Sequence, residues 1–229
     1  MSLVIGIHLG ELVMLAADKR VVTVVDDELL HLSDDADKIL DVGIGHVTGS
    51  GYVPLLEPVK HAMREANISH TDQILQIINK EREALRQESI DIETTEEYIR
   101  KTGWLFTYRT VVEGKQRLRV GIAHPSLGEK VALLEVGTAK LIGPIDCDPH
   151  EVARVSDWLN ENLKLTSEIL DCLTSFEYHT PFLITCFRDI AGICKNVSEE
   201  FHVAIMGVDG TKLLSNAISS TVTTVTLKR

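Results

Sequence analysis

The hydrophobic pattern of the chain changes period along its length, and this order constrains the fold more than any single motif. Strand-like segments fill the first fifty residues, and two helical patterns follow them. Strands return from Trp104 to Ile142, two further helical patterns come next, and strands close the chain. Strands joined mostly by hairpins, with helices in pairs, favour antiparallel sheets covered by helical layers. A doubly wound parallel sheet would instead need a helix at each crossover between strands.

The individual elements follow from alternation, helical spacing and turn residues. The expected strands are 4–9, 12–17, 21–25 and 39–48, then 105–112, 117–124 and 131–136, and finally 201–208, 211–214 and 221–227. A polar, acidic segment from Asp26 to Asp37 follows the strand expected over 21–25. The first expected helix has an apolar face from Leu55 to Ala66, and the second begins at Asp72 as its N-cap. The third is expected from about Pro149. The fourth is expected from Pro181 to about Asn196.

Composition restricts the classes of protein to which the chain can belong. At 229 residues, 44% hydrophobic and 25% charged, the chain is expected to form one domain, 1–229, with a sizeable core. No apolar run approaches the ~20 residues that span a bilayer, and the N-terminus does not resemble a signal peptide. We therefore expect a cytoplasmic protein that does not bind membranes. The net charge of -11 argues against a nucleic-acid partner. The four cysteines and nine histidines match no metal-ligand spacing, so no metal or cofactor is expected.

The opening of the chain carries the most specific motif. Residues 2–7 (SLVIGI) and 10–20 (GELVMLAADKR) form a short strand with a glycine, a turn, and an apolar strand that ends in Ala-Ala-Asp-Lys-Arg. This opening resembles that of proteasome β subunits. Counting back from Asp18 without a gap places Ser2 at the position of the family's nucleophile.

Three further segments extend the resemblance. Residues 37–40 (DKIL) resemble the segment with the catalytic lysine, and 48–51 (TGSG) resemble the segment before the first long helix. Residues 189–194 (DIAGIC), followed by Phe201-His202, are similar to the bacterial ATP-dependent, proteasome-related peptidase. The resemblance covers residues 2–66 and 181–210. It implies an α+β fold, the four-layer αββα sandwich of N-terminal-nucleophile hydrolases. It also implies a homo-oligomeric ring, a peptide or unfolded-protein substrate, and an ATPase partner.

The resemblance also implies roles for five residues. Ser2 would be the nucleophile of a threonine- or serine-type endopeptidase, with its own α-amine, of pKa about 7.7–8.0, as the base. This chemistry needs removal of Met1, because an amide cannot act as that base. Lys38 would lower the pKa of the hydroxyl, and Asp18 would hold Lys38 in place. The Gly49 N–H would stabilise the oxyanion, and Ser198 would support the amine.

Some positions depart from the family pattern, and three functions stay open. Serine replaces the usual threonine, the spacing from Asp18 to Lys38 is longer than usual, and Asn196 stands where an aspartate is usual. The Ser/Gly-rich loop before the third helix is replaced by residues 141–146 (LIGPID). The chain is therefore interpreted as a subunit of a self-compartmentalised peptidase. The alternatives are a non-catalytic ring or scaffold subunit and, third, an amidase or acylase acting on small molecules. Taken singly, each site residue also has an ordinary structural explanation.

Overall fold

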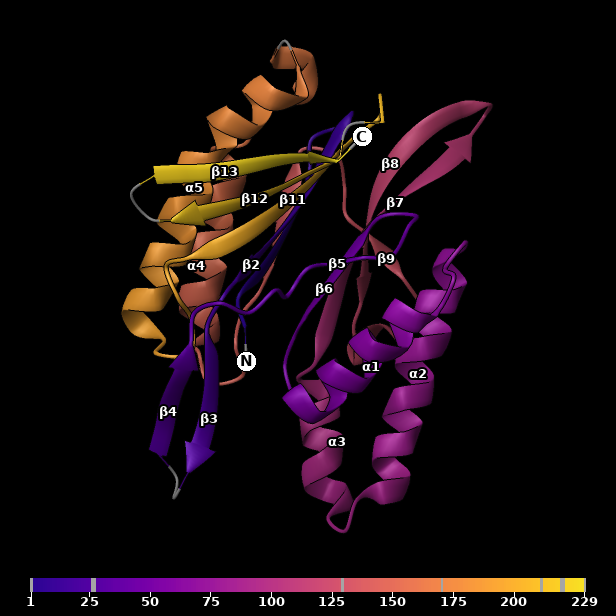
Figure 1. The fold of residues 1–229 in the computed structure, drawn as a ribbon, viewed down its shortest axis with the longest axis vertical. Helices are drawn as coiled ribbons and strands as arrows, with labels where there is room; N and C mark the ends of the chain where they lie inside the picture. Colours follow the sequence, from indigo (N-terminus) through magenta and orange to yellow (C-terminus); the bar gives the residue numbers. More distant parts are fainter. Residues whose placement is uncertain are drawn as a thin grey trace.

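Two antiparallel sheets face each other, and helices cover both outer faces (Figure 1). The computed structural model describes residues 2–25, 28–128, 130–169, 171–210, 212–218 and 221–228. In Figure 1 the layers run across the view from the α4–α5 helices, through the two sheets, to the α1–α3 helices. The predicted α+β sandwich with four αββα layers is therefore confirmed.

The first sheet has the strand order β10-β1-β2-β11-β12-β13, and all its neighbours pair antiparallel. Its strands are β1 (Val4–His8), β2 (Leu12–Asp18), β10 (Thr138–Ile142), β11 (Phe201–Gly207), β12 (Lys212–Ile218) and β13 (Thr221–Lys228). Thr211, where the penultimate strand was expected to start, lies outside the described residues. In the β1–β2 hairpin Val4 pairs with Ala17, so the start of β1 and the end of β2 lie side by side.

The second sheet has the strand order β5-β6-β7-β8-β9 and is also antiparallel. Its strands are β5 (Leu40–Asp41), β6 (His46–Ser50), β7 (Gly103–Val112), β8 (Lys115–Ala123) and β9 (Ala132–Leu133). The single strand predicted over 39–48 is wrong, because the chain turns back between β5 and β6. Gly43 adopts a φ of 82° in this turn, which glycine does without steric cost.

A separate two-stranded ribbon, β3 (Val21–Val25) and β4 (Glu28–Ser33), projects from the body of the molecule (Figure 1). The segment 26–37, which the sequence showed only as polar and acidic, therefore contains the unpredicted strand β4; Asp26 and Asp27 themselves lie outside the described residues. Leu30 and Leu32 alternate with polar residues but are 45% and 61% exposed. The acidic composition of this segment concealed the alternation, because β4 pairs with β3 while Leu30 and Leu32 stay exposed.

The helices are α1 (Val53–Glu65), α2 (Thr71–Glu88), α3 (Ile92–Arg100), α4 (Pro149–Glu161) and α5 (Cys172–Ile193). The first helical group thus has three members, and the prediction of a pair is wrong. The N-cap of α2 is His70, whose side chain accepts from the backbone N–H of Asp72. The cap is therefore two residues before the predicted one. No helix in the described part of the chain combines the length and the apolar character needed to cross a membrane.

The last long helix begins nine residues before the predicted start at Pro181. Asp171 caps α5 by accepting from the backbone N–H of Thr174, and Pro181 lies inside the helix. Proline is common in the first turn of helices, which favoured the wrong start. The N-cap signal of Asp171 is the one that the chain uses.

Three hydrophobic clusters fill the spaces between the four layers. Leu3, Ile5 and Ile7 face α4 and α5 in the first cluster. The alternate residue Val4 packs between the two sheets with Leu105 and Val120. The third cluster lies between the second sheet and α1–α3. Because both faces of β1 and β2 are buried, these strands are apolar throughout, and the polar residues at their ends are held in fixed positions.

Candidate active site

Asp18, the last residue of β2, bonds both to the start of the chain and to Lys38, which lies in the segment between β4 and β5. Its carboxylate is fully buried and accepts the backbone N–H of Leu3 at 2.9 Å. It also accepts the Lys38 Nζ at 3.0 Å and the backbone N–H of Arg20 at 3.0 Å. The structure therefore brings Asp18, Lys38 and the residue next to Ser2 together, around one carboxylate.

Lys38 is fixed at both of its ends. Its Nζ donates to the carbonyl of Arg20 at 2.6 Å, and its own carbonyl accepts the Thr48 hydroxyl at 3.1 Å. The long spacing from Asp18 does not separate the pair. The β3–β4 ribbon takes up the intervening residues, and its base is closed by a bond from the Ala36 N–H to the Lys19 carbonyl at 3.1 Å.

Burial dominates the electrostatics of the pair. Burial lowers the pKa of the Lys38 amine, and the neighbouring Asp18 carboxylate opposes this effect. The charge of Lys60 lowers the pKa of Lys38 further. Burial likewise raises the pKa of Asp18, against the influence of Lys38. Burial and Lys60 thus make the charged form of Lys38 less favourable than in water, and the contact with Asp18 offsets part of this effect.

A cavity of about 330 Å³ opens beside this pair. Its lining residues are Ser2, Arg20, Val21, Val22, Ala36, Asp37, Lys38, Val53, Leu56, Glu57 and Lys60. Ser2 is only 4% exposed, although it is the first residue that the structure describes; Met1 lies outside the described residues. The cavity therefore places Ser2 and Lys38 on one concave surface.

The segment Thr48–Ser50 of β6 lies against the start of the chain. The Ser50 hydroxyl donates to the Ser2 carbonyl and lies 3.1 Å from the carbonyl of Gly143. Between Thr48 and Ser50, a Cβ at Gly49 would lie 2.7 Å from the Trp104 ring. Only glycine therefore fits at this position, whatever its chemical role.

Ser198 and Asn196 are placed differently from the other predicted site residues. The Ser198 hydroxyl accepts the backbone N–H of Lys19 at 3.1 Å and donates to the Glu200 carbonyl at 2.6 Å. Among the described residues, no hydrogen bond joins it to Ser2. The Asn196 amide donates to the Asp146 carboxylate, and its buried Oδ1 meets no donor in the described part of the chain. Ser198 is thus not among the residues that line the cavity of Ser2 and Lys38.

Sequence reasoning missed the part played by Arg20. Its guanidinium forms a two-bonded ion pair with Asp34, at 2.9 and 3.0 Å, and donates to the carbonyls of Lys195 and Val197. The side chain of Arg20 therefore links the base of the ribbon to the loop after α5, while its own backbone carbonyl accepts the hydrogen bond from Lys38. The sequence signal that could have identified Arg20 is its place two residues after Asp18 in the Asp-Lys-Arg motif.

Lys60 of α1 was also missed. It is 6% exposed, pairs with Glu57 at 3.1 Å, and lies on the predicted apolar face of α1, one turn after Leu56. A charged residue at a core-facing helical position was the signal that could have identified it.

Comparison with known proteins establishes the fold. No protein-family model and no curated protein matches the sequence significantly. Among solved structures, the helical assembly of the Anbu complex from Pseudomonas aeruginosa is similar at 10% identity, with a TM-score of 0.63 over 96% of this chain and 88% of that chain. Anbu from Hyphomicrobium sp. strain MC1 is 12% identical, with a TM-score of 0.56 over 98% and 86% of the two chains.

A third solved structure points the same way. Anbu from Yersinia bercovieri, described as an ancestral beta-subunit, is 12% identical with a TM-score of 0.57 over 98% of this chain and 86% of that one. At this level of identity the likeness concerns the fold alone. The predicted resemblance to proteasome subunits is therefore confirmed at the level of the fold: the chain has the proteasome-like architecture of Anbu.

Proposed function

We propose that this chain is a subunit of a self-compartmentalised peptidase that cleaves peptide bonds with the hydroxyl of Ser2. The observation that carries the proposal is the buried Asp18–Lys38 pair, 3.0 Å apart, beside a cavity that Ser2 also lines. A buried ion pair of this kind is costly to maintain, which favours a chemical role over a merely stabilising one.

The reaction follows from the groups around this cavity. Once Met1 is removed, the free amine of Ser2 accepts the proton of its hydroxyl, and the oxygen attacks the peptide carbonyl. Lys38 favours the ionised oxygen by its charge. The resemblance assigns the oxyanion donor to the N–H of Gly49, which is not among the residues that line the cavity. The peptide C–N bond then breaks, the leaving amine takes the proton, and water hydrolyses the ester on Ser2 by the same route.

The mixed lining of the cavity favours peptide substrates over the small molecules that an amidase or acylase would bind. Val53 and Leu56 give it an apolar wall, and the Glu57–Lys60 pair gives it a polar one. We propose unfolded protein or peptides as substrate, a homo-oligomeric ring as the assembly, and an ATPase that supplies the substrate. The helical assembly of the Pseudomonas aeruginosa Anbu complex is a precedent for self-association of this fold.

A second function is favoured by one observation. Asn196, at the position where the resemblance leads one to expect an aspartate, bonds to Asp146 and shows no hydrogen bond to Ser2. An amide cannot supply the negative charge that would stabilise a protonated amine beside it. This substitution favours a non-catalytic ring or scaffold subunit.

The test begins with the intact mass and N-terminal sequence of untagged protein, followed by turnover of a mixed fluorogenic peptide panel. We expect a free Ser2 and measurable hydrolysis. Ser2→Ala keeps a small second residue, so Met1 is still removed, and it should abolish turnover. Lys38→Met should lower kcat by about 10²-fold or more. Lys80→Met, an exposed lysine of α2, is the matched control and should not change kcat.

Each outcome separates the two functions. Retained Met1 with no turnover would support the scaffold subunit. Turnover that survives Ser2→Ala would show that another residue is the nucleophile, and it would overturn the site assignment.

A further inference from the structure

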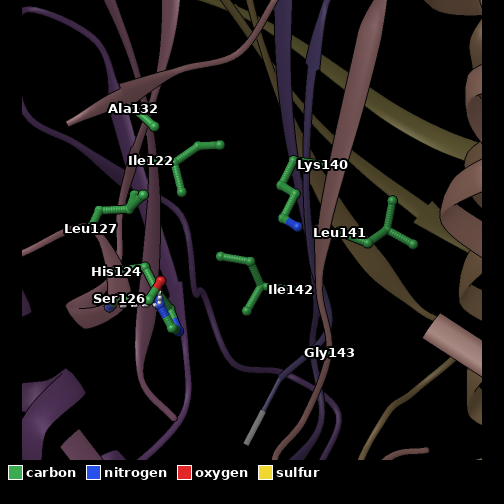
Figure 2. A pocket seen from close by; sticks show the side chains of 9 residues that line it. All are labelled: Ile122, His124, Ser126, Leu127, Ala132, Lys140, Leu141, Ile142 and Gly143. Atoms are coloured by element: carbon green, nitrogen blue, oxygen red, sulfur yellow. Dashed lines mark hydrogen bonds between the residues drawn. The ribbon is translucent and has the colours of Figure 1, made fainter. Parts of the chain in front are cut away.

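A second cavity, of about 480 Å³, opens between the two sheets at the edges formed by β8, β9 and β10 (Figure 2). Its lining residues are Ile122, His124, Ser126, Leu127, Ala132, Lys140, Leu141, Ile142 and Gly143. We call it the edge cavity. In Figure 2 the side chains of Ile122 and Ile142 approach each other from the two sheets, with Leu127 beside them. The size and the apolar walls are typical of small-molecule sites, which occupy roughly 300–1,000 Å³.

The polar groups of the edge cavity are all neutral or basic. Lys140 extends from β10 into the space between the sheets, and it forms no ion pair with any carboxylate among the described residues (Figure 2). No acidic residue appears in the cavity lining that the structure describes. Lys140 is exposed, and its ammonium group beside apolar walls would favour an anion over a cation.

His124 adds a hydrogen-bond donor on the opposite wall. Its Nδ1 accepts the backbone N–H of Ser126 at 3.2 Å, so the neutral imidazole carries its proton on Nε2. Burial lowers the pKa of His124, and the charges of Arg82 and Lys140 lower it further. The ring is therefore a neutral N–H donor.

Arg82 extends the positive field behind His124. This side chain of α2 is 6% exposed, and its Nε and Nη2 have no hydrogen-bond acceptor within the described part of the chain. The charge of Arg82 lowers the pKa of His124. Arg82 does not line the edge cavity, so it adds positive charge to the region without contacting the cavity itself.

We propose that the edge cavity binds a small amphipathic carboxylate. Its apolar chain would lie between Ile122 and Ile142, and its carboxylate would pair with the Lys140 ammonium and accept the Nε2–H of His124. This inference does not depend on the peptidase function, because the edge cavity shares no lining residue with the cavity of Ser2. The alternative is that the stem of Lys140 covers apolar surface while its head stays in water.

Octanoate is the probe, and octylamine is the matched probe of opposite charge. We expect octanoate, titrated into the full chain labelled on isoleucine methyl groups, to shift the Ile122 and Ile142 signals in a saturable way. The signals of Ile78 and Ile190, in the other hydrophobic clusters, should stay unchanged. Octylamine should not shift any of them, because Lys140 and Arg82 repel it.

Variants then test the charge. Lys140→Met keeps most of the side-chain volume and should weaken octanoate binding at least about tenfold. Lys140→Arg should bind within a factor of a few of the original chain, and Lys115→Met, at the exposed tip of the β7–β8 hairpin, is the control that should not change affinity. Equal binding of octylamine, unchanged affinity of Lys140→Met, or no saturable shift at Ile122 and Ile142 would each overturn the proposal.

Discussion

At the scale of single residues, Asp18 determines how the candidate active site is arranged. Its two carboxylate oxygens accept from Leu3, Arg20 and Lys38, which precede or follow different strands. The same carboxylate therefore positions the start of the chain and neutralises a lysine that is 7% exposed. Removing its charge while keeping its shape separates these two effects.

Asp18→Asn should lower the free energy of unfolding by about 3–5 kcal/mol, because it leaves Lys38 buried without a counter-charge. The amide oxygen still accepts from the Leu3 N–H, so the geometry at Ser2 is less affected than the charge. Urea denaturation measures the change. Asp35→Asn, at a side chain that is 91% exposed, is the control and should stay within about 0.5 kcal/mol.

A double-mutant cycle with Lys38→Met makes this result specific. Asp18→Asn combined with Lys38→Met should cost less than the sum of the two single changes, since no unpaired charge remains. Strictly additive costs would mean that the two residues do not interact in the folded chain.

At the scale of elements, sequence reasoning worked best where periodicity was long and worst where an element was short or exposed. The β1–β2 and β7–β8 hairpins and the apolar face of α1 were predicted close to their observed bounds. Of the elements that it missed, α3 buries only Thr95 and Ile99, so it has too few apolar positions for its period to be visible. The strand β4 depends on pairing across the ribbon, which a local pattern does not report.

Substitution of Pro181 tests how a proline inside α5 affects the stability of the chain. It is exposed and lies nine residues inside α5, where proline cannot donate the backbone hydrogen bond of a helix. Pro181→Ala should therefore raise the free energy of unfolding by about 1–3 kcal/mol. Thermal and urea unfolding measure the change, with Glu177→Ala, exposed one turn earlier, as the control. A loss of stability would show that the packing of α5 needs the geometry that Pro181 imposes.

At the scale of the whole molecule, the candidate site exists because two sheets are held at a fixed separation. The layers could be predicted from the order of strands and helices, together with the family resemblance. The meeting of Asp18 with Lys38 could be expected from the resemblance alone. The contacts of Arg20 with Val197 and of Asn196 with Asp146 could not, since they join residues 177 and 50 positions apart in the sequence, which no local pattern relates.

Gly6 tests the separation of the sheets. It lies in β1, and a Cβ there would be 3.1 Å from Val120 and 3.3 Å from Leu105 of the opposite sheet. Gly6→Ala should lower the free energy of unfolding by about 1–3 kcal/mol, because the facing side chains must move apart. Gly192→Ala, in α5 with no atom near the added Cβ, should be neutral or slightly stabilising. Equal effects in the two variants would show that the sheets accommodate the extra methyl group without cost.

The hydroxyl of Ser50 has one proton and two carbonyl oxygens within reach, those of Ser2 and Gly143. It can donate to only one of them at any instant, so the two bonds are alternatives. Ser2 lines one cavity and Gly143 lines the other. The Ser50 hydroxyl thus connects one lining residue of each cavity, and a bond gained at one of them is a bond lost at the other.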